Sequence, residues 1–130
     1  MSDEVRAKIK ITSFTDIKAW QEGHKLVLKI YEITNQFPAR ETYSLVDQMR
    51  RAASSITSNI AEGFGRQSFR DRVKFYYIAQ GSLTELKNQI LIAKDIGYIK
   101  EGDFEGIAAQ ANTVHKLLHG FILKSKSFIS

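Results

Sequence analysis

The first pattern along the chain is the recurrence of apolar residues at every third, fourth or seventh position, which is the spacing of one face of an α-helix. Glycines and the single proline gather between the stretches with this spacing, where they are typical of connections. The pattern therefore predicts four helices. They are expected after Thr15 or Asp16 to Asn35, from about Glu41 to the glycines at 63–65, from Ser68 to Gly97, and from Glu101 or Gly102 onward.

Each predicted helix carries one apolar stripe that has to be buried against its neighbours. Ser68 followed by Asp71 also has the spacing of a capping box, which favours a helix start there. The expected core positions are Trp20, Val27, Ile30, Tyr31 and Thr34 in the first helix; Leu45, Met49, Ala52 or Ala53, Ile56, Ile60 and Gly63 in the second; Tyr76, Ala79, Leu83, Leu86, Ile90 and Ala93 in the third; and Phe104, Ile107, Ala108, Ala111, Val114, Leu118, Phe121 and Ile122 in the fourth.

The fold class predicted by four amphipathic helices with short connections is all-α, as an antiparallel up-down-up-down four-helix bundle. A chain of 130 residues is large enough for one such core and has the size of a single domain. We place the bundle domain at residues 15–126. Residues 1–14 have no helix signal and are expected to form a short irregular N-terminal arm.

Apolar residues outside the stripes predict self-association. They flank the core positions and add apolar surface that a single bundle is not expected to cover, so we expect a homo-oligomer. These flanking residues are Leu26, Leu28, Ile33, Val46, Leu91, Ile92, Leu117 and Leu123.

The composition argues against enzymes, metal sites and membrane proteins. The chain has no cysteine for a disulfide or thiolate, and no run of about 18 apolar residues, so we expect a cytoplasmic protein without membrane contact.

His115 and His119 have the spacing of a zinc-binding helix, but no third ligand is evident. Glu62 is the best acid or base candidate, yet no nucleophile stands at a defined spacing from it. We therefore expect no metal, no cofactor and no enzymatic activity.

The charge is basic and unevenly distributed. The chain has 19 Lys and Arg against 14 Asp and Glu, a formal net charge of +5. Between positions 50 and 74 the basic residues are opposed only by Glu62 and Asp71, which leaves +4 in that segment. Phosphates of RNA or DNA would be neutralised there in a salt-sensitive way, without sequence reading. The candidate nucleic-acid contacts are Arg50, Arg51, Arg66, Arg70, Arg72 and Lys74, with Phe69, Phe75, Tyr76 and Tyr77 nearby for stacking on bases.

An alternative function uses the same basic residues for subunit pairing, in a purely structural assembly module without nucleic-acid binding. Glu62 is expected to pair with Arg51, Arg66 or another chain. Most of the nearby aromatic rings are also expected in the core or in a subunit interface.

The segment QMRRAASSITSNIAEGFGR at 48–66 places small residues after two adjacent arginines. Small side chains allow a neighbouring helix to approach closely. Asn59 lies beside the stripe and is expected to hydrogen-bond to a neighbouring helix, because an unpaired buried amide costs about 1–3 kcal/mol. Gly63 or Gly65 is expected to adopt the left-handed conformation that ends a helix. The segment lacks a complete nucleotide-binding motif.

The third predicted helix carries a second group of candidate structural residues, Gly81, Ser82 and Glu85. A glycine inside a helix costs about 1 kcal/mol relative to alanine, so Gly81 predicts a close backbone approach. Glu85 is expected to pair with an arginine such as Arg50 across a helix or subunit boundary.

Several blocks of residues together carry a family resemblance. They are Phe14-x-x-Ile17-x-x-Trp20; Phe37-Pro38 with Glu41; Gln48-Met49-Arg50-Arg51-Ala52-Ala53-Ser54-Ser55-Ile56 with Asn59-Ile60-Ala61-Glu62-Gly63; Ile78-Ala79-Gln80-Gly81-Ser82-Leu83-Thr84-Glu85-Leu86; and Gly97-Tyr98. Over about residues 14–122 the chain resembles the bacterial four-helix-bundle family encoded within intervening sequences of 23S ribosomal RNA genes.

This resemblance implies a left-handed antiparallel bundle, a ring-shaped homo-oligomer that is commonly a pentamer, and no enzymatic activity. The chain is also similar to the accessory protein of diversity-generating retroelements, a basic ring that associates with nucleic acid and a reverse transcriptase. A nucleic-acid enzyme is therefore a further expected partner. The family often has proline where this chain has Thr57, so the break in the second helix that the family implies is less certain here.

Overall fold

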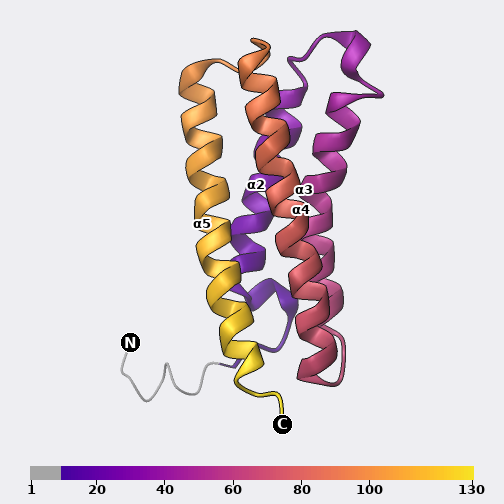
Figure 1. The fold of residues 1–130 in the computed structure, drawn as a ribbon, viewed down its shortest axis with the longest axis vertical. Coiled ribbons are helices and arrows are strands. Elements are labelled where there is room, and N and C mark those ends of the chain that lie inside the picture. The colour runs from indigo at the N-terminus through magenta and orange to yellow at the C-terminus, as the bar shows by residue number, and fades with distance from the viewer. Residues whose placement is uncertain (1–9) are drawn as a thin grey trace.

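The computed structural model describes residues 10–130, which form four α-helices and two short 3-10 helices (Figure 1). No β-strand occurs in this part of the chain. The elements are η1 Phe14–Asp16, α2 Lys18–Thr34, η2 Ala39–Glu41, α3 Leu45–Phe64, α4 Phe69–Asp95 and α5 Glu101–Lys126. The all-α class predicted from the sequence is confirmed, whereas most of the predicted N-terminal arm lies outside the described residues.

The four long helices lie side by side in one bundle, and each helix runs in the opposite direction to the one before it (Figure 1). Connections at 35–44, 65–68 and 96–100 join consecutive helices, and such short connections make consecutive helices antiparallel neighbours. α3 packs on α2 and α4, and α5 packs on α4 and α2, so every helix has two neighbours around one core. Both the α3–α4 connection and the C-terminus lie at the lower end of the view.

The core confirms the predicted stripes of α3 and α4 and most of the stripe of α5. All the predicted core positions of α3 and α4 are buried, and five of the eight predicted for α5 are 5% exposed or less. Phe104, Ala108 and Phe121 of α5 are partly buried at the edge of that core. The buried residues of α5 that were predicted are Ile107, Ala111, Val114, Leu118 and Ile122.

The predicted stripe of α2 is partly wrong. Leu26 and Ile33, assigned to the flanks, are buried, whereas Tyr31 is 43% exposed. Trp20 is only partly buried, because it lies at the edge of the core between Phe14, at 5.2 Å, and His24, at 4.9 Å between ring centroids. α2 has to contact both α3 and α5, and that requirement turns its buried face toward the Leu26 side.

The surplus of apolar surface is smaller than the sequence predicts, since the core also takes up Leu26, Ile33 and Val46. Leu117 is partly buried. The flanking residues that remain exposed are Leu28 at 56%, Leu91 at 48%, Ile92 at 43% and Leu123 at 53%.

The helix starts are set by local caps. The Ser68 hydroxyl accepts the Asp71 amide at 3.1 Å, which confirms the predicted start of α4. α3 begins later than the predicted Glu41, because residues 39–41 form a separate 3-10 turn. Glu41 is tied to the α4–α5 connection instead, where its Oε2 accepts the Tyr98 hydroxyl at 2.7 Å.

The helix ends differ from the prediction in one place. Gly97 has φ +88°, and the Tyr98 amide donates to Ala93 O at 2.9 Å, which is the hydrogen bond of a Schellman motif after α4. The predicted left-handed conformation at Gly63 or Gly65 is wrong: Gly63 lies within α3 and Gly65 has φ −76°. α3 also runs through Thr57 without a break.

Candidate nucleic-acid interface

The structure divides the predicted basic residues between two places. Arg50 and Arg51 lie in the first half of α3, while Arg66 lies in the connection between α3 and α4 and Arg70, Arg72 and Lys74 lie in the first two turns of α4. At a rise of about 1.5 Å per helical residue, the two groups are on the order of 20 Å apart along α3. These six residues therefore do not form one continuous contact surface.

Arg50 is used to join α3 to the end of α2. Its Nε donates to Thr34 Oγ1 at 3.0 Å and its Nη2 donates to Asn35 Oδ1 at 2.9 Å and to Tyr31 O at 3.4 Å. The guanidinium also lies 4.6 Å from the centre of the Tyr31 ring. A cation at a helix C-terminus is favourable, because the last carbonyl groups carry partial negative charge. These contacts make Arg50 a structural residue that joins α3 to the end of α2.

The predicted pair between Arg50 and Glu85 does not form within the chain. Arg50 is directed toward α2, and Glu85 accepts a hydrogen bond from Gln89 Nε2 at 3.2 Å on its own helix. Arg51 points outward, with 80% of its side chain exposed, and pairs with Asp47 at 3.1 Å. Such an exposed pair one turn apart contributes little to stability.

Two arginines at the α3–α4 turn are held by aromatic rings. The Arg72 guanidinium lies between Phe64 and Phe69, 5.0 and 4.9 Å from their ring centres, and its Nε donates to Arg66 O at 2.7 Å. The Arg66 guanidinium lies 4.6 Å from the centre of the Phe75 ring. Cation–π contacts of this kind fix both the charge and the turn that carries it.

Glu62 pairs with Arg66, which is one of the partners predicted for it. Arg66 Nη2 donates to Glu62 Oε1 at 3.0 Å, with about half of each side chain exposed. The carboxylate therefore neutralises part of the charge at the turn.

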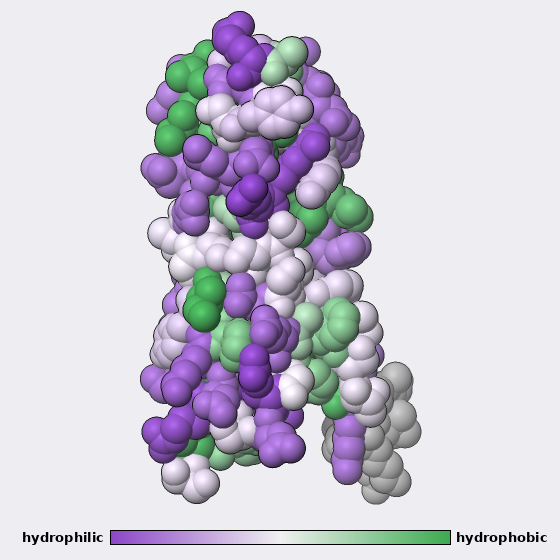
Figure 2. Space-filling model, turned by 90° about the vertical axis from the view of Figure 1, so that its right-hand side faces the viewer, coloured by the Kyte–Doolittle hydropathy of each residue, from purple (hydrophilic) through white to green (hydrophobic). Residues whose placement is uncertain are grey.

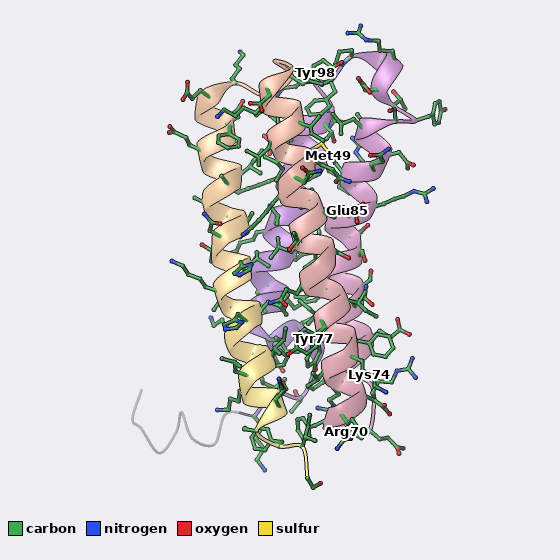
Figure 3. All side chains as sticks on the ribbon, in the orientation of Figure 1. Met49, Arg70, Lys74, Tyr77, Glu85 and Tyr98 are labelled. Carbon is green, nitrogen blue, oxygen red and sulfur yellow. The ribbon has the colours of Figure 1, made fainter. Side chains whose placement is uncertain are left out.

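Arg70 and Lys74 are the most available cations of this region. Arg70 is exposed and makes no hydrogen bond or ion pair with the residues that the structure describes. Lys74 approaches Asp71 only to 3.7 Å, and 71% of its side chain is exposed. Figure 3 shows both residues, together with Tyr77, on the lower third of α4. A polyanion would meet these two side chains without first breaking a strong contact.

The C-terminal part of α5 brings cations that sequence reasoning did not include. Lys126 Nζ donates to the Tyr77 hydroxyl of α4 at 3.2 Å, and Lys124 lines the same hollow as Arg72, with a volume of about 320 Å³. We call Arg66, Arg70, Arg72, Lys74, Lys124 and Lys126 the basic corner. Glu62 and Asp71 oppose these residues within it, which leaves a side-chain charge of +4. The sequence signal was the KSKSF run at 124–128, but only the fold places it beside α4.

The aromatic residues near this corner differ in exposure. Tyr76 is 1% exposed, and its burial raises the pKa of its phenol to about 12, so it is a core residue. Phe69 and Phe75 are partly covered by Arg72 and Arg66. Tyr77, by contrast, is 45% exposed.

The predicted polar residues between α3 and α4 form a short hydrogen-bonded chain. The Ser55 and Ser82 hydroxyls are 2.8 Å apart across the two helices. Asn59 Nδ2 donates to Ser55 O at 2.8 Å and to Ser55 Oγ at 3.0 Å. The predicted direct hydrogen bond from Asn59 to a neighbouring helix is therefore not formed: Asn59 binds Ser55 of its own helix, and Ser55 in turn contacts Ser82 of α4.

The two predicted close-packing glycines behave differently. A Cβ atom at Gly63 would lie 2.8 Å from Phe75 Cβ and 3.1 Å from Arg72 O, so α3 and α4 are in close contact there. Gly81 is exposed, and a Cβ atom at that position would meet nothing within 4 Å. The predicted close backbone approach at Gly81 is thus absent within the chain.

Figure 2 shows how hydrophilic and hydrophobic residues are distributed over the side of the molecule that includes α3 and α4. Hydrophilic residues gather toward both ends of this face, and a paler band crosses its middle. Ser54, Ser55 and Ser58 of α3 lie at the middle of that helix. The lower hydrophilic region includes the end of the bundle that carries the α3–α4 turn.

The structure gives no site for a metal among residues 10–130, where no group of three His, Cys, Asp or Glu side chains could hold an ion. Burial is the main cause that lowers the pKa of His115, followed by the charges of Lys87 and His119. Its Nδ1 is buried without a hydrogen-bond partner. Within the same residues, every helix is too short or too polar to cross a membrane.

The comparisons with known proteins agree with this architecture. The family model described as 23S rRNA-intervening sequence protein matches residues 15–120. A crystal structure of a protein with unknown function from the S23 ribosomal protein family of Bacteroides thetaiotaomicron is 21% identical, with a TM-score of 0.72, over 80% of this chain and 97% of that chain. This likeness shows a shared fold. No curated protein matches the chain.

Proposed function

The chain belongs to the 23S rRNA-intervening sequence protein family, and from this premise we propose that it is a non-enzymatic homo-oligomer whose basic corner binds RNA or DNA. The family resemblance implies five subunits. The observation that carries the proposal is the excess charge of the basic corner, where six cationic side chains are opposed by two carboxylates. Arg70 and Lys74 supply the available cations, and Arg66 and Arg72 support the turn on which they stand.

Phosphate neutralisation is the physical basis of this binding. Each phosphate contacted by Lys or Arg releases condensed counterions, so affinity falls as salt rises. The contacts come from side chains at the end of a bundle and not from a helix placed along a groove. We therefore expect binding that depends on salt and not on base sequence.

Self-association is supported by the apolar surface that the protomer leaves exposed. Leu28, Leu91, Ile92 and Leu123 are each more than 40% exposed, and Ile78 is 52% exposed. Exposed apolar residues spread over α2, α4 and α5 favour contacts on more than one side of the bundle, as a ring requires. Several copies would also multiply weak phosphate contacts at each basic corner.

A salt series of nucleic-acid binding tests the proposal. We expect binding of labelled RNA or DNA at low ionic strength, and we expect the Arg70→Ala/Lys74→Ala variant to weaken it and to reduce the slope of log affinity against log salt by about 2. The control is Arg51→Ala/Lys29→Ala, which removes the same charge from exposed positions of α3 and α2 that lie away from the basic corner. Absence of binding by the unmodified protein even at low salt would exclude the proposal.

The alternative is an assembly module in which the basic residues serve subunit pairing. The observation behind it is that Arg50, Arg66 and Arg72 already make contacts within the chain, which leaves fewer cations available for phosphates. Sedimentation of Arg70→Ala/Lys74→Ala separates the two functions. An intact oligomer with weakened nucleic-acid binding supports the proposed function, and a dissociated one supports the alternative.

A further inference from the structure

Two exposed aromatic rings border the basic corner. Tyr77 of α4 is 45% exposed and Phe128, just after α5, is 54% exposed. Other exposed tyrosines of this chain, such as Tyr43, lie elsewhere, whereas Tyr77 and Phe128 stand beside cationic side chains. Because the rings lie next to the cations of this corner, the surface is complementary to a ligand that has both negative charge and flat apolar groups.

Both rings are supported from within the protein. Phe128 lies against Phe69, with 5.0 Å between ring centroids and 33° between the ring planes, and Arg72 lies 4.9 Å from the centre of the same Phe69 ring. The Tyr77 hydroxyl accepts a hydrogen bond from Lys126 at 3.2 Å. A supported ring loses little conformational freedom on binding, so it can serve as a stacking platform.

Arg70 and Lys74 lie on α4 between Tyr77 and Phe69, the residue against which Phe128 packs. Phe69, which supports Phe128, and Tyr77 are about 12 Å apart at the helical rise of about 1.5 Å per residue. Arg70 and Lys74 fall within this interval, and they share the face of α4 that carries Tyr77 (Figure 3). The order along the helix is therefore aromatic, cationic, cationic, aromatic.

We infer that the basic corner binds single-stranded nucleic acid in preference to duplex, with unpaired bases stacked on Tyr77 and Phe128 and phosphates held by Arg70, Lys74 and Lys126. Single-strand binding proteins combine basic residues that follow the backbone with aromatic side chains on which bases stack. In a duplex the base faces are already covered by neighbouring bases, so only the phosphates remain available to this surface. The inference rests on the proposed nucleic-acid binding and adds the class of strand.

Fluorescence anisotropy with labelled oligonucleotides tests this preference. We compare a single strand of mixed sequence with the corresponding duplex, as RNA and as DNA, at one fixed low salt concentration. For the unmodified protein we expect the single strand to bind at least about fivefold more tightly, as stacking of one base provides. Equal affinity for both forms would overturn the inference while leaving the proposed function intact.

Variants of the rings give the second test. Tyr77→Leu and Phe128→Leu should each weaken single-strand binding by about fivefold or more and leave duplex binding unchanged, whereas Tyr77→Phe should retain the affinity because stacking needs the ring and not the hydroxyl. Tyr43→Leu is the matched control, because Tyr43 is 94% exposed at the opposite end of the bundle. Equal loss for single strand and duplex would mean that the rings act only through the fold.

An abasic strand of the same length provides a test with the unmodified protein. It keeps the phosphates and lacks the bases, so it should bind about as weakly as the duplex and should not respond to Tyr77→Leu. Tight binding of the abasic strand would assign all the affinity to charge and overturn the inference. Failure of every probe to bind at low salt would instead remove the proposed function as well.

Discussion

Gly63 of α3 faces Tyr76 of α4 so closely that a Cβ atom on Gly63 would lie 2.8 Å from Tyr76 Cε1. Phe75 Cβ would lie at the same distance, and Arg72 O at 3.1 Å. The missing side chain thus allows α4 to begin directly against the end of α3. Arg72 donates a hydrogen bond to Arg66 O, and Phe75 contacts the Arg66 guanidinium. The close contact at Gly63 positions Arg72 and Phe75, and it therefore also positions the cations of the basic corner.

Gly63→Ala is predicted to destabilise the protein by about 1–3 kcal/mol, because an added methyl group in a packed contact forces the helices apart. The loss should appear as a lower midpoint in urea unfolding followed by circular dichroism. Gly81→Ala is the matched control, since its Cβ meets open space within the protomer. Removing a glycine from a helix interior should stabilise that variant by up to about 1 kcal/mol. Equal midpoints for the two variants would contradict the close contact at Gly63.

Arg50→Ala is predicted to cost about 1–3 kcal/mol of unfolding free energy. The substitution removes hydrogen bonds to Thr34 and Asn35 and the cation–π contact with Tyr31. Arg51→Ala, next to it but exposed, should change stability by less than about 0.5 kcal/mol. Chemical denaturation measures the unfolding free energy of both variants. A similar loss for the two would show that the contribution of Arg50 comes from its charge and not from its contacts with α2.

A double-mutant cycle tests whether Arg50 has a second partner. Within the protomer Arg50 and Glu85 contact different groups, so Arg50→Ala and Glu85→Ala should be additive to within about 0.5 kcal/mol. The measurement is best made at a protein concentration low enough to dissociate an oligomer and again at a high one. Non-additivity at high concentration alone would place the predicted ion pair between subunits.

The helices could be predicted from the sequence where aliphatic and small residues dominate the stripe. In α4 the predicted positions Leu83, Leu86 and Ile90 are buried, whereas Ile78, Leu91 and Ile92 of the same helix stay exposed, so the prediction of the buried stripe is confirmed. In α2 the predicted stripe lies on the side of Trp20 and Tyr31 because their large rings count as apolar, whereas the buried face lies on the side of Leu26 and Ile33. How far such rings are covered depends on Phe14 and Arg50, which belong to other elements.

The candidate site could be predicted only in part, because charge density along the chain does not reveal distance in space. The cluster at 66–74 is local in sequence and remains together at the α3–α4 turn. Arg50 is close to this cluster in sequence, but in the structure it lies toward the other end of α3, where it donates a hydrogen bond to Thr34 of α2. Lys126 lies 49 residues from Tyr77 in the sequence and comes to it only because α5 packs on α4.

His115 gives a prediction for mildly acidic pH. Burial, with the charges of Lys87 and His119, lowers the pKa of this imidazole in the folded protein below its ordinary value of 6.5. The unfolded chain therefore binds the proton more readily, so the unfolding free energy should fall as pH decreases through about 6.5. His115→Leu should remove this decline and also removes a buried nitrogen without a partner. Urea unfolding at several pH values between about 8 and 5 measures the effect, and the exposed variant His119→Gln should keep most of the decline.

Glu41 and Tyr98 predict a further loss of stability at lower pH. The hydrogen bond from the Tyr98 hydroxyl is the main cause that lowers the pKa of the Glu41 carboxyl below its ordinary value of 4.5. A carboxylate with a lowered folded pKa stabilises the protein above the pKa of the unfolded chain, and this contribution is lost as pH falls from about 4.5 through the folded pKa.

Tyr98→Phe should lower stability at neutral pH, and the difference from the unmodified protein should shrink as the pH falls below about 4.5, because protonated Glu41 no longer favours the hydroxyl as donor. Tyr43→Phe, which removes a hydroxyl from an exposed tyrosine, is the control; it should change neither the stability at neutral pH nor the dependence of stability on pH. Denaturation by urea at neutral pH and in steps to about pH 3 measures both variants. A difference for Tyr98→Phe that stays constant across this range would mean that the lost hydroxyl acts through packing in the α4–α5 connection and not through the charge of Glu41.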